Sequence, residues 1–473
     1  MIAQRRLSNP KVPIRNPKKN SDDASSSRFD VAILGGGLSG LAAAVRLSLG
    51  GARVALFERA GKLGGRCYSY VDEATGDVVD NGQHVLVGAY HHTLHYLELI
   101  GTRGFLRQQT RLSLPLHHPT KGFCTFEVSS LPRPFHLSAG MLTFKLLSLR
   151  ERRRLLNVGL ALSSWTPALE RELSLLTIDR WLDSLNQSAE AKRCLWFPVA
   201  ISMMNEHPER ASALLFARSL RATFLARKSD SAILIPQIGQ TELYAREAER
   251  VIVENKGVVF TNTEVGAVEV TGSKVIGVRL KNGRRVSAKH VISALPYFAL
   301  RKIMPAGVRN EKPFVDLSKF ESSPIISLHL WFDREFMNVD YVGFIGRTLQ
   351  WVFNRRRIVG DSKTTGYLSA VLSGAYDIVD EPKEKLIPVA LQELREVFPE
   401  ARQAKLIHSV VIKEKRATFS ATNEIEPFRP APETPIRNFY LAGDWTNTGL
   451  PATIEGAVMS GFRAADLVEN ALP

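Results

Sequence analysis

The sequence has little cysteine. Cys67, Cys124 and Cys194 are the three cysteines among 473 residues, and no two of them form a Cys-x-x-Cys pair or a metal-binding spacing. A disulfide framework and a cysteine-based zinc module are therefore not expected. This usage is typical of a reducing compartment or of thiols without a role, and we expect a cytoplasmic location.

Long apolar runs are absent as well. No stretch of about 18 apolar residues occurs, so no membrane-spanning helix is expected. Residues 1–28 contain no apolar segment typical of a secretory signal, and Pro10, Pro13 and Pro17 oppose the amphipathic helix of a transit peptide. This segment is rich in Pro, Asn and Ser, and we interpret it as a disordered basic tail.

Acidic residues are too few to balance the basic ones, which leaves a net charge of +15. The tail accounts for +5 of this, from seven Lys or Arg and two Asp. Basic clusters also occur at residues 150–154 and 355–357. They are compatible with solvated faces, with nucleic-acid binding or with attraction to anionic lipid.

The first chemistry-bearing motif follows the tail. Residues 29–34 predict a strand, 38–49 a helix and 53–57 a second strand, which together form a βαβ unit. The turn between the first strand and the helix carries Gly35-x-Gly37-x-x-Gly40, a dinucleotide fingerprint. The backbone around Leu38 and Ser39 would offer N–H groups to phosphates.

An acid follows the second strand at the expected distance. Glu58 lies eighteen residues after Gly40 (58 − 40), next to Arg59. A carboxylate at this place accepts hydrogen bonds from ribose hydroxyls and disfavours a 2′-phosphate. The motif thus has its strand, its helix and its acid, and it predicts a dinucleotide site.

Two later segments resemble further parts of the same domain. Residues 257–296 alternate with period two around turn signals, a helix is predicted from about Thr241, and a strand (438–442) and a helix (454–468) close the chain. The intervening residues mix helical and strand patterns. We predict an α/β fold with a discontinuous Rossmann-like nucleotide domain (29–104, 231–300 and 435–473) and an interleaved α+β substrate domain (105–230 and 301–434).

The stretch GDVVDNGQHVLVGAY (76–90) is unusual because the polar quintet from Asp80 to His84 interrupts aliphatic residues. Turn propensity alone predicts a surface loop. The alternative is that something buried and polar lies against the quintet.

Together these segments resemble the superfamily of flavin-dependent amine oxidases and phytoene desaturases. The resemblance rests on Gly64-Gly65-Arg66, on Gly76, Asp80 and Gly82, and on the closing Gly443-Asp444 and Glu455-Gly456-Ala457. It implies FAD as the cofactor. It also implies that Gly82 lets the chain pass close to the flavin ring and that Gln83 and His84 lie at the reactive face of that ring.

The resemblance assigns further cofactor-binding residues. It implies that Arg66, next to Gly65, supplies a fixed positive charge, and that Asp444, after Gly443, binds the ribityl or phosphate region. The helix that begins near Ile454-Glu455 would direct its N-terminal dipole at the ring. Val265 matches a position whose backbone meets the adenine.

One branch, the hydroxysqualene dehydroxylases of hopanoid biosynthesis, is most similar, through DNGQHVLVGAY (80–90) and LAGDWTNTGLPATIEGA (441–457). It implies reductive dehydroxylation of hydroxysqualene to squalene, with hydride transfer from reduced flavin to an allylic carbon. A phytoene-type carotenoid desaturase and a non-catalytic flavoprotein remain alternatives. Amine substrates are disfavoured, because Thr453 stands where amine oxidases commonly place a Tyr.

His84 is the candidate general acid, with Gln83 beside it, because an imidazole titrates near neutral pH. The other interpretation is that His84 only hydrogen-bonds flavin or backbone. Asp80 is expected to hold the turn, while Asn205 and Arg416 are weaker candidates on the substrate side. We predict no metal site, and His91, His92 and His95 are expected to cap and line a helix.

The apolar substrate needs a channel and an entry. Trp196, Phe197, Met203 and Met204 either line this channel or belong to the core. Residues 141–165 suit a helix on the inner face of the cytoplasmic membrane, or a solvated helix. We expect an isoprenoid substrate and no nucleic-acid partner. The electron donor is unknown: no second GxGxxG motif marks an NAD(P)H site, and a ferredoxin or a quinone is as plausible as NAD(P)H.

Overall fold

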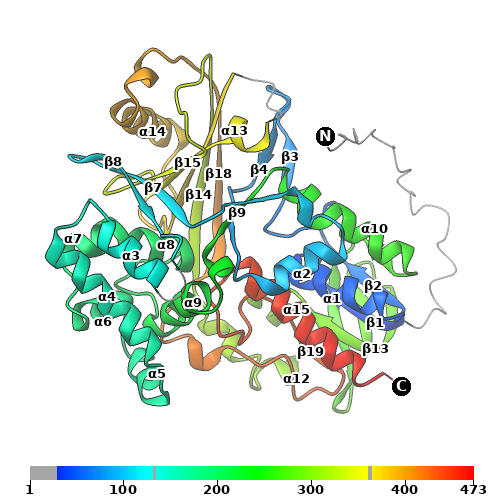
Figure 1. Cartoon of the computed structure of the whole chain (residues 1–473). Helices are drawn as coiled ribbons and strands as arrows, with labels where there is room; N and C mark the ends of the chain where they lie inside the picture. The colour runs from blue at the N-terminus through cyan, green and yellow to red at the C-terminus, as the bar shows by residue number, and fades with distance from the viewer. Residues whose placement is uncertain (1–28, 132–134, 361–364, 473) are drawn as a thin grey trace.

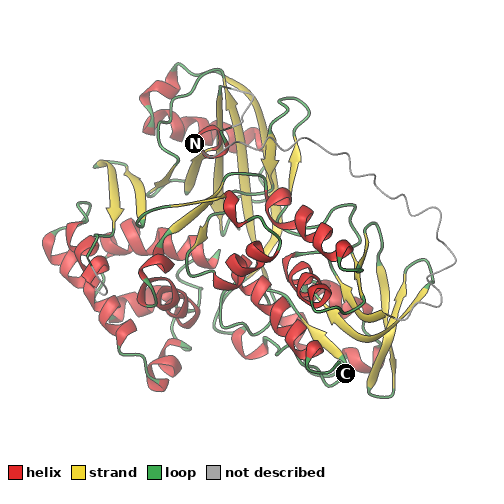
Figure 2. Cartoon of the chain, turned by 45° about the vertical axis from the view of Figure 1, so that its right-hand side comes forward, coloured by secondary structure: helices red, strands yellow, loops and turns green. Residues whose placement is uncertain are grey.

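The computed structural model describes residues 29–131, 135–360 and 365–472, so the tail predicted for residues 1–28 lies outside the described residues. Figure 1 shows three regions: a sheet with α1, α2, α10 and α15 beside the C-terminus, a second sheet above, and a group of helices from α3 to α9. The turned view in Figure 2 shows the same separation of strands and helices.

The first sheet has a parallel core. Its order is β10-β2-β1-β13-β19, which in chain order reads 3-2-1-4-5, as in Rossmann-like folds. The strands are β1 (Phe29–Leu34), β2 (Val54–Phe57), β10 (Val258–Phe260), β13 (Arg285–Ser293) and β19 (Phe439–Leu441). The first half of β13 pairs antiparallel with β12 (Lys274–Leu280), which pairs with β11 (Val265–Thr271). This architecture confirms the predicted α/β class.

Helices cover this sheet. They are α1 (Leu38–Leu49), α2 (His91–Leu99), α10 (Glu247–Glu254) and α15 (Ile454–Glu469), with the π-helical turn η5 (Glu242–Arg246) before α10. The bounds of β1 and α1 agree with the predicted strand and helix. Helix α1 packs closely against α15. A Cβ on Gly461 of α15 would lie only 2.2 Å from the Ser39 carbonyl oxygen of α1, so glycine permits this close approach.

The second sheet has the order β18-β14-β17-β16-β15-β7-β8 and is antiparallel except between β15 and β7. Its strands are β7 (Ser113–His118), β8 (Gly122–Glu127), β14 (Ser322–Phe332), β15 (Tyr341–Phe344), β16 (Trp351–Asn354), β17 (Gly366–Ser373) and β18 (Leu406–Phe419). Side chains alternate along β14. Leu328 and Leu330 share a core with α14 (Lys383–Val397), whereas Trp331 packs with Val79 on the opposite face, next to the polar quintet.

Short elements join the regions. They are β3 (Ser69–Val71), β4 (Val78–Asp80), β5 (Leu86–Val87), β6 (Leu106–Gln108), β9 (Ile233–Pro236), α11 (Tyr297–Ile303), α12 (Ala306–Arg309) and α13 (Arg355–Val359). The 3₁₀ turns are η2 (Arg103–Phe105), η4 (Lys228–Ser231), η6 (Asp316–Lys319), η7 (Pro399–Arg402) and η8 (Glu426–Phe428). The strands of the first sheet come from residues 29–57, 258–293 and 439–441, and the domain boundaries stay a prediction.

Most helices of the helical region begin after a residue whose side-chain hydroxyl caps the helix, such as Thr166, Thr177 or Ser188. Its members are α3 (Phe135–Thr143), α4 (Leu149–Ser163), α5 (Pro167–Leu173), α6 (Ile178–Ser184), α7 (Ala189–Ala191), the π-helical η3 (Lys192–Trp196), α8 (Phe197–Met204) and α9 (Ala213–Leu225). No helix within the described ranges has both the length and the apolarity needed to cross a membrane.

The interpretation of residues 141–165 as one helix is wrong. Helix α3 ends at Thr143 and α4 begins at Leu149, with Phe144 buried between them. The break follows from a capping box, in which Ser148 accepts a hydrogen bond from the Glu151 backbone and the Glu151 side chain bonds back to Ser148.

Candidate functional site

The nucleotide motif forms a tight turn between β1 and α1. Gly35 has φ +103°, and a Cβ there would lie 2.9 Å from the Ala294 carbonyl oxygen. A Cβ on Gly40 would lie 1.9 Å from the Gly35 carbonyl oxygen. The turn and the helix packing therefore require glycine at both positions.

Gly37 differs from its neighbours, because packing does not require it to be glycine. The nearest protein atom to a Cβ on Gly37 would be the Gly65 Cα, at 3.9 Å. Gly37 is the N-cap of α1, and no described side chain caps this helix end. The open space at Gly37 fits a pyrophosphate that approaches the backbone. The N–H groups of the first turn of α1, around Leu38 and Ser39, could bind it.

Glu58 directly follows β2, beside this turn. Its Oε2 accepts a hydrogen bond from the Gly36 N–H at 2.7 Å, and its Oε1 accepts one from the Ala60 N–H at 2.8 Å. A carboxylate oxygen can accept a second bond, so ribose hydroxyls still fit. The Glu58 carbonyl accepts from the Thr263 N–H, which brings Val265 to the same edge, while Arg59 is exposed.

Arg66 connects three of the motifs. Its Nη2 lies 2.7 Å from Asp444 Oδ1, in the closing motif, and its carbonyl accepts a hydrogen bond of 2.7 Å from Asn81 Nδ2, in the polar quintet. Gly65 has φ +60°, so the turn before Arg66 favours glycine. The structure thus brings together segments that are hundreds of residues apart in the sequence.

The closing motif depends on an arginine that sequence reasoning missed. The Gly443 N–H donates to Ser460 Oγ at 2.8 Å, which ties the motif to α15. The buried Arg429 donates to the carbonyl oxygens of Asp444 at 3.2 Å and Thr446 at 2.6 Å. It lies fifteen residues before Asp444 (444 − 429) and outside any motif, so no sequence signal marked it.

Glu455 lies at the start of α15 but directs its carboxylate at α2. It accepts hydrogen bonds from the backbone N–H groups of His92 at 3.0 Å and Thr93 at 2.9 Å, and from both of their side chains. Thr453 caps α15 by accepting from the Gly456 N–H. A cofactor would therefore meet the backbone of Ile454 and Glu455 rather than the Glu455 carboxylate.

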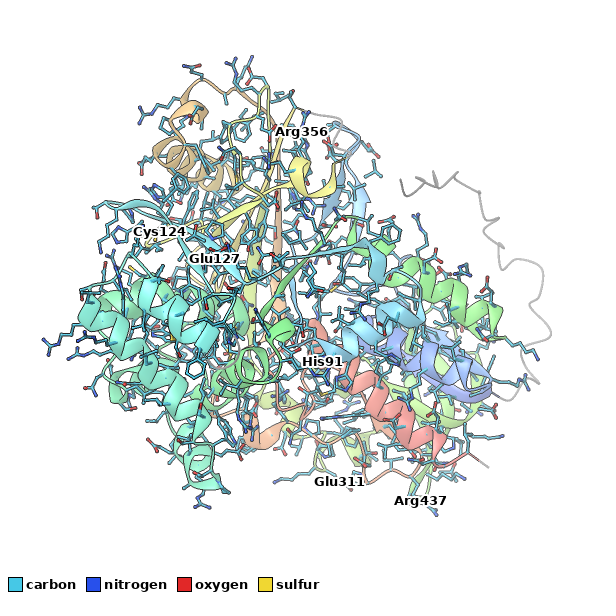
Figure 3. All side chains as sticks on the ribbon, viewed as in Figure 1. His91, Cys124, Glu127, Glu311, Arg356 and Arg437 are labelled. Carbon is cyan, nitrogen blue, oxygen red and sulfur yellow. The ribbon has the colours of Figure 1, made fainter. Side chains whose placement is uncertain are left out.

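The three clustered histidines lie on α2, which confirms that they line a helix, but the N-cap of this helix is Tyr90 and not a histidine. His92 pairs with Glu455, His95 lies 3.7 Å from Glu98, and His91, labelled in Figure 3, lies 3.5 Å from Asp230. Since each ring faces a different carboxylate, they do not converge on one point.

The polar quintet is buried against polar partners, which resolves the question raised by its sequence. Asp80 accepts a hydrogen bond from the Gln240 N–H at 3.0 Å, and Gln240 Nε2 donates to the Gly82 carbonyl oxygen. His84 Nδ1 donates to the same oxygen at 2.9 Å, and Gln83 Nε2 donates to the His84 carbonyl oxygen at 3.0 Å. The quintet is therefore a fixed loop and not a surface turn.

Arg355 completes this network from the start of α13, directly after β16 of the second sheet. It is 2% exposed, its Nη2 lies 3.0 Å from Asp80 Oδ2, and its Nη1 donates to Gln83 Oε1. The interpretation of residues 355–357 as one surface cluster is therefore wrong for Arg355. Arg356, labelled in Figure 3 near α13, is exposed as expected.

Burial and charge set the protonation of this loop. Burial raises the pKa of Asp80, and Arg355 opposes that rise. Burial lowers the pKa of His84 below its usual 6.5, and the Asp80 carboxylate opposes that fall. The pKa of the nearby His329 falls to about 3 through burial and the charge of Arg355, so this ring is neutral.

The weaker candidates lie in structural places. Asn205, with φ +47°, ends α8, and its side chain bonds the Gly374 N–H at 2.8 Å and Thr418 Oγ1 at 2.8 Å. Arg416 lies over the Phe298 ring at 4.7 Å. The proposed channel residues belong to the core or pack against it: Trp196 and Met204 are buried, and Phe197 and Met203 are partly buried.

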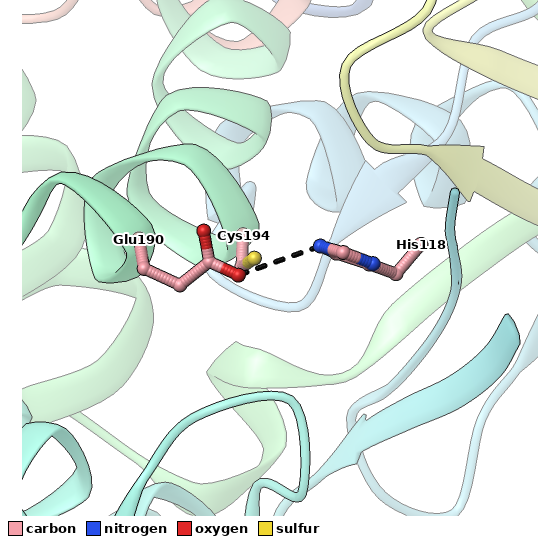
Figure 4. Close-up of side chains that lie close together, drawn as sticks. All are labelled: His118, Glu190 and Cys194. Atoms are coloured by element: carbon pink, nitrogen blue, oxygen red, sulfur yellow. Dashed lines mark ion pairs between the residues drawn. The ribbon is translucent and has the colours of Figure 1, made fainter. Parts of the chain in front are cut away.

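His118, Glu190 and Cys194 form the one cluster in the described ranges whose potential ligand atoms lie within 4.8 Å of one another. Figure 4 shows the His118 ring facing Glu190 beside Cys194. His118 Nδ1 accepts from the Lys121 N–H at 3.2 Å, and Arg193 Nη2 lies 3.1 Å from His118 Nε2, so both ring nitrogens have protein partners. Burial raises the pKa of Cys194 to about 12, which keeps its thiol protonated. The cluster therefore acts as a hydrogen-bonded group.

Comparison with known proteins agrees with this geometry. The family model of flavin-containing amine oxidoreductases matches residues 38–469. Hydroxysqualene dehydroxylase of Rhodopseudomonas palustris is 30% identical over 459 residues, with 93% of this chain and 98% of that protein covered. The 15-cis-phytoene desaturase of Synechococcus elongatus is 25% identical, with 93% and 95% covered.

Solved structures share the fold at low identity. An oxidoreductase from Methanosarcina mazei has a TM-score of 0.71 at 18% identity, with 92% of this chain and 99% of that chain covered. Putrescine oxidase bound to putrescine has a TM-score of 0.68 at 19% identity, with 94% and 99% covered. The matched family model and the full-length relatives lead to one conclusion: the chain belongs to the flavin-containing amine oxidoreductase family and is an FAD-dependent oxidoreductase.

Proposed function

We propose that the protein reductively dehydroxylates hydroxysqualene to squalene, as a step of hopanoid or related triterpenoid synthesis. Relatives named hydroxysqualene dehydroxylase, 28–30% identical over nearly their whole length, carry this proposal. The phytoene desaturases are 25–26% identical. Thr453 supports a substrate other than an amine, because it caps α15 where amine oxidases commonly have a Tyr.

The cofactor-binding residues are proposed from the family resemblance, and the geometry of the glycine turn and of the closing motif supports them. Pyrophosphate would lie over Gly37 and the N-terminus of α1, and ribose beside Glu58. Adenine would meet the backbone at Val265. Arg66, Asp444 and the start of α15 would surround the ribityl and ring end, and Gly82, Gln83 and His84 would face the ring.

The chemistry that bound, reduced FAD supplies is hydride transfer to an allylic carbon. In the balanced step the C–O bond breaks, the hydroxyl leaves as water with one added proton, and the hydride forms the new C–H bond. His84 is proposed to give that proton from Nε2, since its Nδ1 is held by the Gly82 carbonyl oxygen. The hydrogen bonds of Gln83 and Gln240 keep the loop in place while this happens.

The decisive experiment is anaerobic. The FAD-loaded protein is reduced with dithionite and mixed with hydroxysqualene, while flavin absorbance is followed and the extracted lipid is identified by mass. Flavin reoxidation with an equal amount of squalene is expected, and reduced FAD without protein is the control. Reduced enzyme that stays reduced would contradict the proposal.

The alternative is a carotenoid desaturase, which removes hydride from its substrate. The two activities change the flavin spectrum in opposite directions, because the dehydroxylase oxidises reduced flavin and the desaturase reduces oxidised flavin. If the oxidised protein becomes reduced on addition of phytoene, and a desaturated polyene is recovered, then the desaturase assignment replaces the dehydroxylase. If neither substrate changes the flavin, both substrate assignments fail.

An apolar substrate dissolves in membranes, and we also propose peripheral contact of the helical region with anionic lipid. On α4, Leu149 is 69% and Leu160 is 66% exposed. They are eleven residues apart (160 − 149), close to three helical turns, so they share one face, with the exposed Arg153 between them. Apolar side chains flanked by arginine suit a lipid interface.

A further inference from the structure

Arg355 is the buried member of three consecutive arginines. Its side chain is 2% exposed, whereas those of Arg356 and Arg357 are 42% and 45% exposed. It begins α13 in the second-sheet region, yet its guanidinium contacts Asp80 and Gln83, more than 270 residues earlier (355 − 83 = 272). This contact joins the second sheet to the loop that carries His84.

The second sheet holds Arg355 in place. Asn354, the residue before it, is 1% exposed and caps α13 by accepting a hydrogen bond from the Arg357 N–H. Asn354 Nδ2 also donates to the Met337 carbonyl oxygen at 2.6 Å and to Glu335 Oε1 at 3.0 Å. The backbone of Arg355 is thus fixed, and its planar fork can bridge two acceptors at once.

Stability alone is a weak reason for such an ion pair. Removing both charges from water costs nearly as much as their attraction returns, so buried pairs are often replaceable by apolar residues. Position is a better reason. The Asp80 carboxylate lies between Arg355 and the Gln240 N–H, and Gln240 and His84 both bond the Gly82 carbonyl oxygen.

We propose that Arg355 is a positioning residue for the reaction: it keeps Asp80 ionised and Gln83 oriented, so that the loop presents His84 as a proton donor. The inference rests on the function proposed for His84. It assigns to the second sheet a direct part in the chemistry at the flavin side.

The titratable groups around Asp80 come from several elements. They are His84 on its own loop, Cys67, Glu242, Tyr244, His329 and Tyr367. Burial lowers the pKa of His84, and the Asp80 charge acts to raise it. Without Arg355, the burial that raises the pKa of Asp80 would be less opposed, and a protonated Asp80 would no longer support the charge of His84.

The test compares Arg355→Gln, Asp80→Asn and the double variant in the FAD-loaded protein. The titration of His84 is followed by NMR of labelled histidine rings without substrate, and its signal is assigned by its loss in His84→Gln. Both single variants are expected to lower the pKa of His84 by a similar amount, and the double variant by no more than either. With hydroxysqualene, kcat of Arg355→Gln is expected to fall about tenfold while KM stays within about twofold.

Two further variants make the result decisive. Arg356→Gln, one residue away on the surface, is the matched control and is expected to behave as wild type. Arg355→Lys keeps the charge and is expected to restore the His84 pKa, but not full kcat, because it cannot bridge both acceptors. If Arg355→Gln does not fold, Arg355→Lys and Asp80→Asn carry the test.

An unchanged or raised His84 pKa in Arg355→Gln would overturn the inference, as would the same change in Arg356→Gln. In Asp80→Asn, an unchanged His84 pKa would do the same. The NMR titration does not need turnover. Failure of the proposed substrate would therefore leave this measurement intact, and the two failures can be told apart.

Discussion

His84 lies on a buried loop where two opposing effects set its protonation. Burial lowers its pKa below 6.5 and the Asp80 carboxylate opposes this. A proton donor acts in its charged form, so the active fraction of enzyme grows as pH falls through the lowered pKa. We therefore expect kcat/KM for dehydroxylation to rise as pH falls below 6.5.

His84→Gln should remove that dependence on pH and lower kcat about 100-fold, since general acids contribute roughly 10² to 10⁴. The measurement is a pH profile of squalene formation from reduced enzyme, from pH 5 to 8. FAD content of the variant, read from its absorbance, is the control for folding. A profile that keeps its acid limb in His84→Gln would assign the proton to another group.

Single residues also show what the sequence could and could not reveal. Gly35, Gly37, Gly40 and Glu58 were predictable because their motif is local and each position has a mechanical reason. Arg355 and Arg429 were not, because an arginine in a basic run, or outside any motif, looks like a solvated charge. Their burial depends on carboxylates and carbonyl oxygens that only the tertiary fold brings near.

At the scale of elements, the turn into α1 separates two roles of glycine. A Cβ on Gly40 would overlap the Gly35 carbonyl oxygen at 1.9 Å, whereas one on Gly37 would meet no protein atom closer than 3.9 Å. Gly37→Ala should therefore leave the apoprotein within about 0.5 kcal/mol of wild type. Its methyl group would instead occupy space proposed for the pyrophosphate.

We expect Gly37→Ala to weaken FAD binding about tenfold, equivalent to about 1.4 kcal/mol, and Gly40→Ala to destabilise the fold itself. Thermal unfolding of the apoproteins and fluorescence titration with FAD measure the two effects. Wild-type FAD affinity in Gly37→Ala would place the pyrophosphate elsewhere.

Elements that a short stretch of sequence determines were predicted with correct bounds, as β1 and α1 show. The break between α3 and α4 was missed, although Ser148-x-x-Glu151 is a capping box that the sequence displays. The interpretation of residues 141–165 as one helix concealed it. The burial of Phe144 between the two helices is a tertiary effect that periodicity does not contain.

At the scale of the whole molecule, residues that lie together in the fold are far apart along the chain. The parallel sheet takes strands from residues 29–57, 258–293 and 439–441, and the network at Asp80 adds Arg355 from the second sheet. The return of βαβ-like patterns indicated a discontinuous domain. Which side chains of the inserted region reach the polar quintet at Asp80–His84 depends on how the two sheets face each other, and a single sequence does not encode that in any local pattern.

The outer face of the helical region carries the last prediction. Leu149 and Leu160 project from one face of α4, and inserting an exposed leucine into lipid gains about 1.5 kcal/mol, or about tenfold in binding. The double variant Leu149→Ser, Leu160→Ser should therefore bind vesicles of mixed neutral and anionic phospholipid about 100-fold more weakly, as measured by sedimentation with the vesicles. Ile407→Ser, on β18 and 60% exposed, is the matched control. Added salt should weaken wild-type binding, because Arg153 contributes an electrostatic share. Equal losses in the control and the double variant, or no loss in either, would remove α4 as the lipid contact.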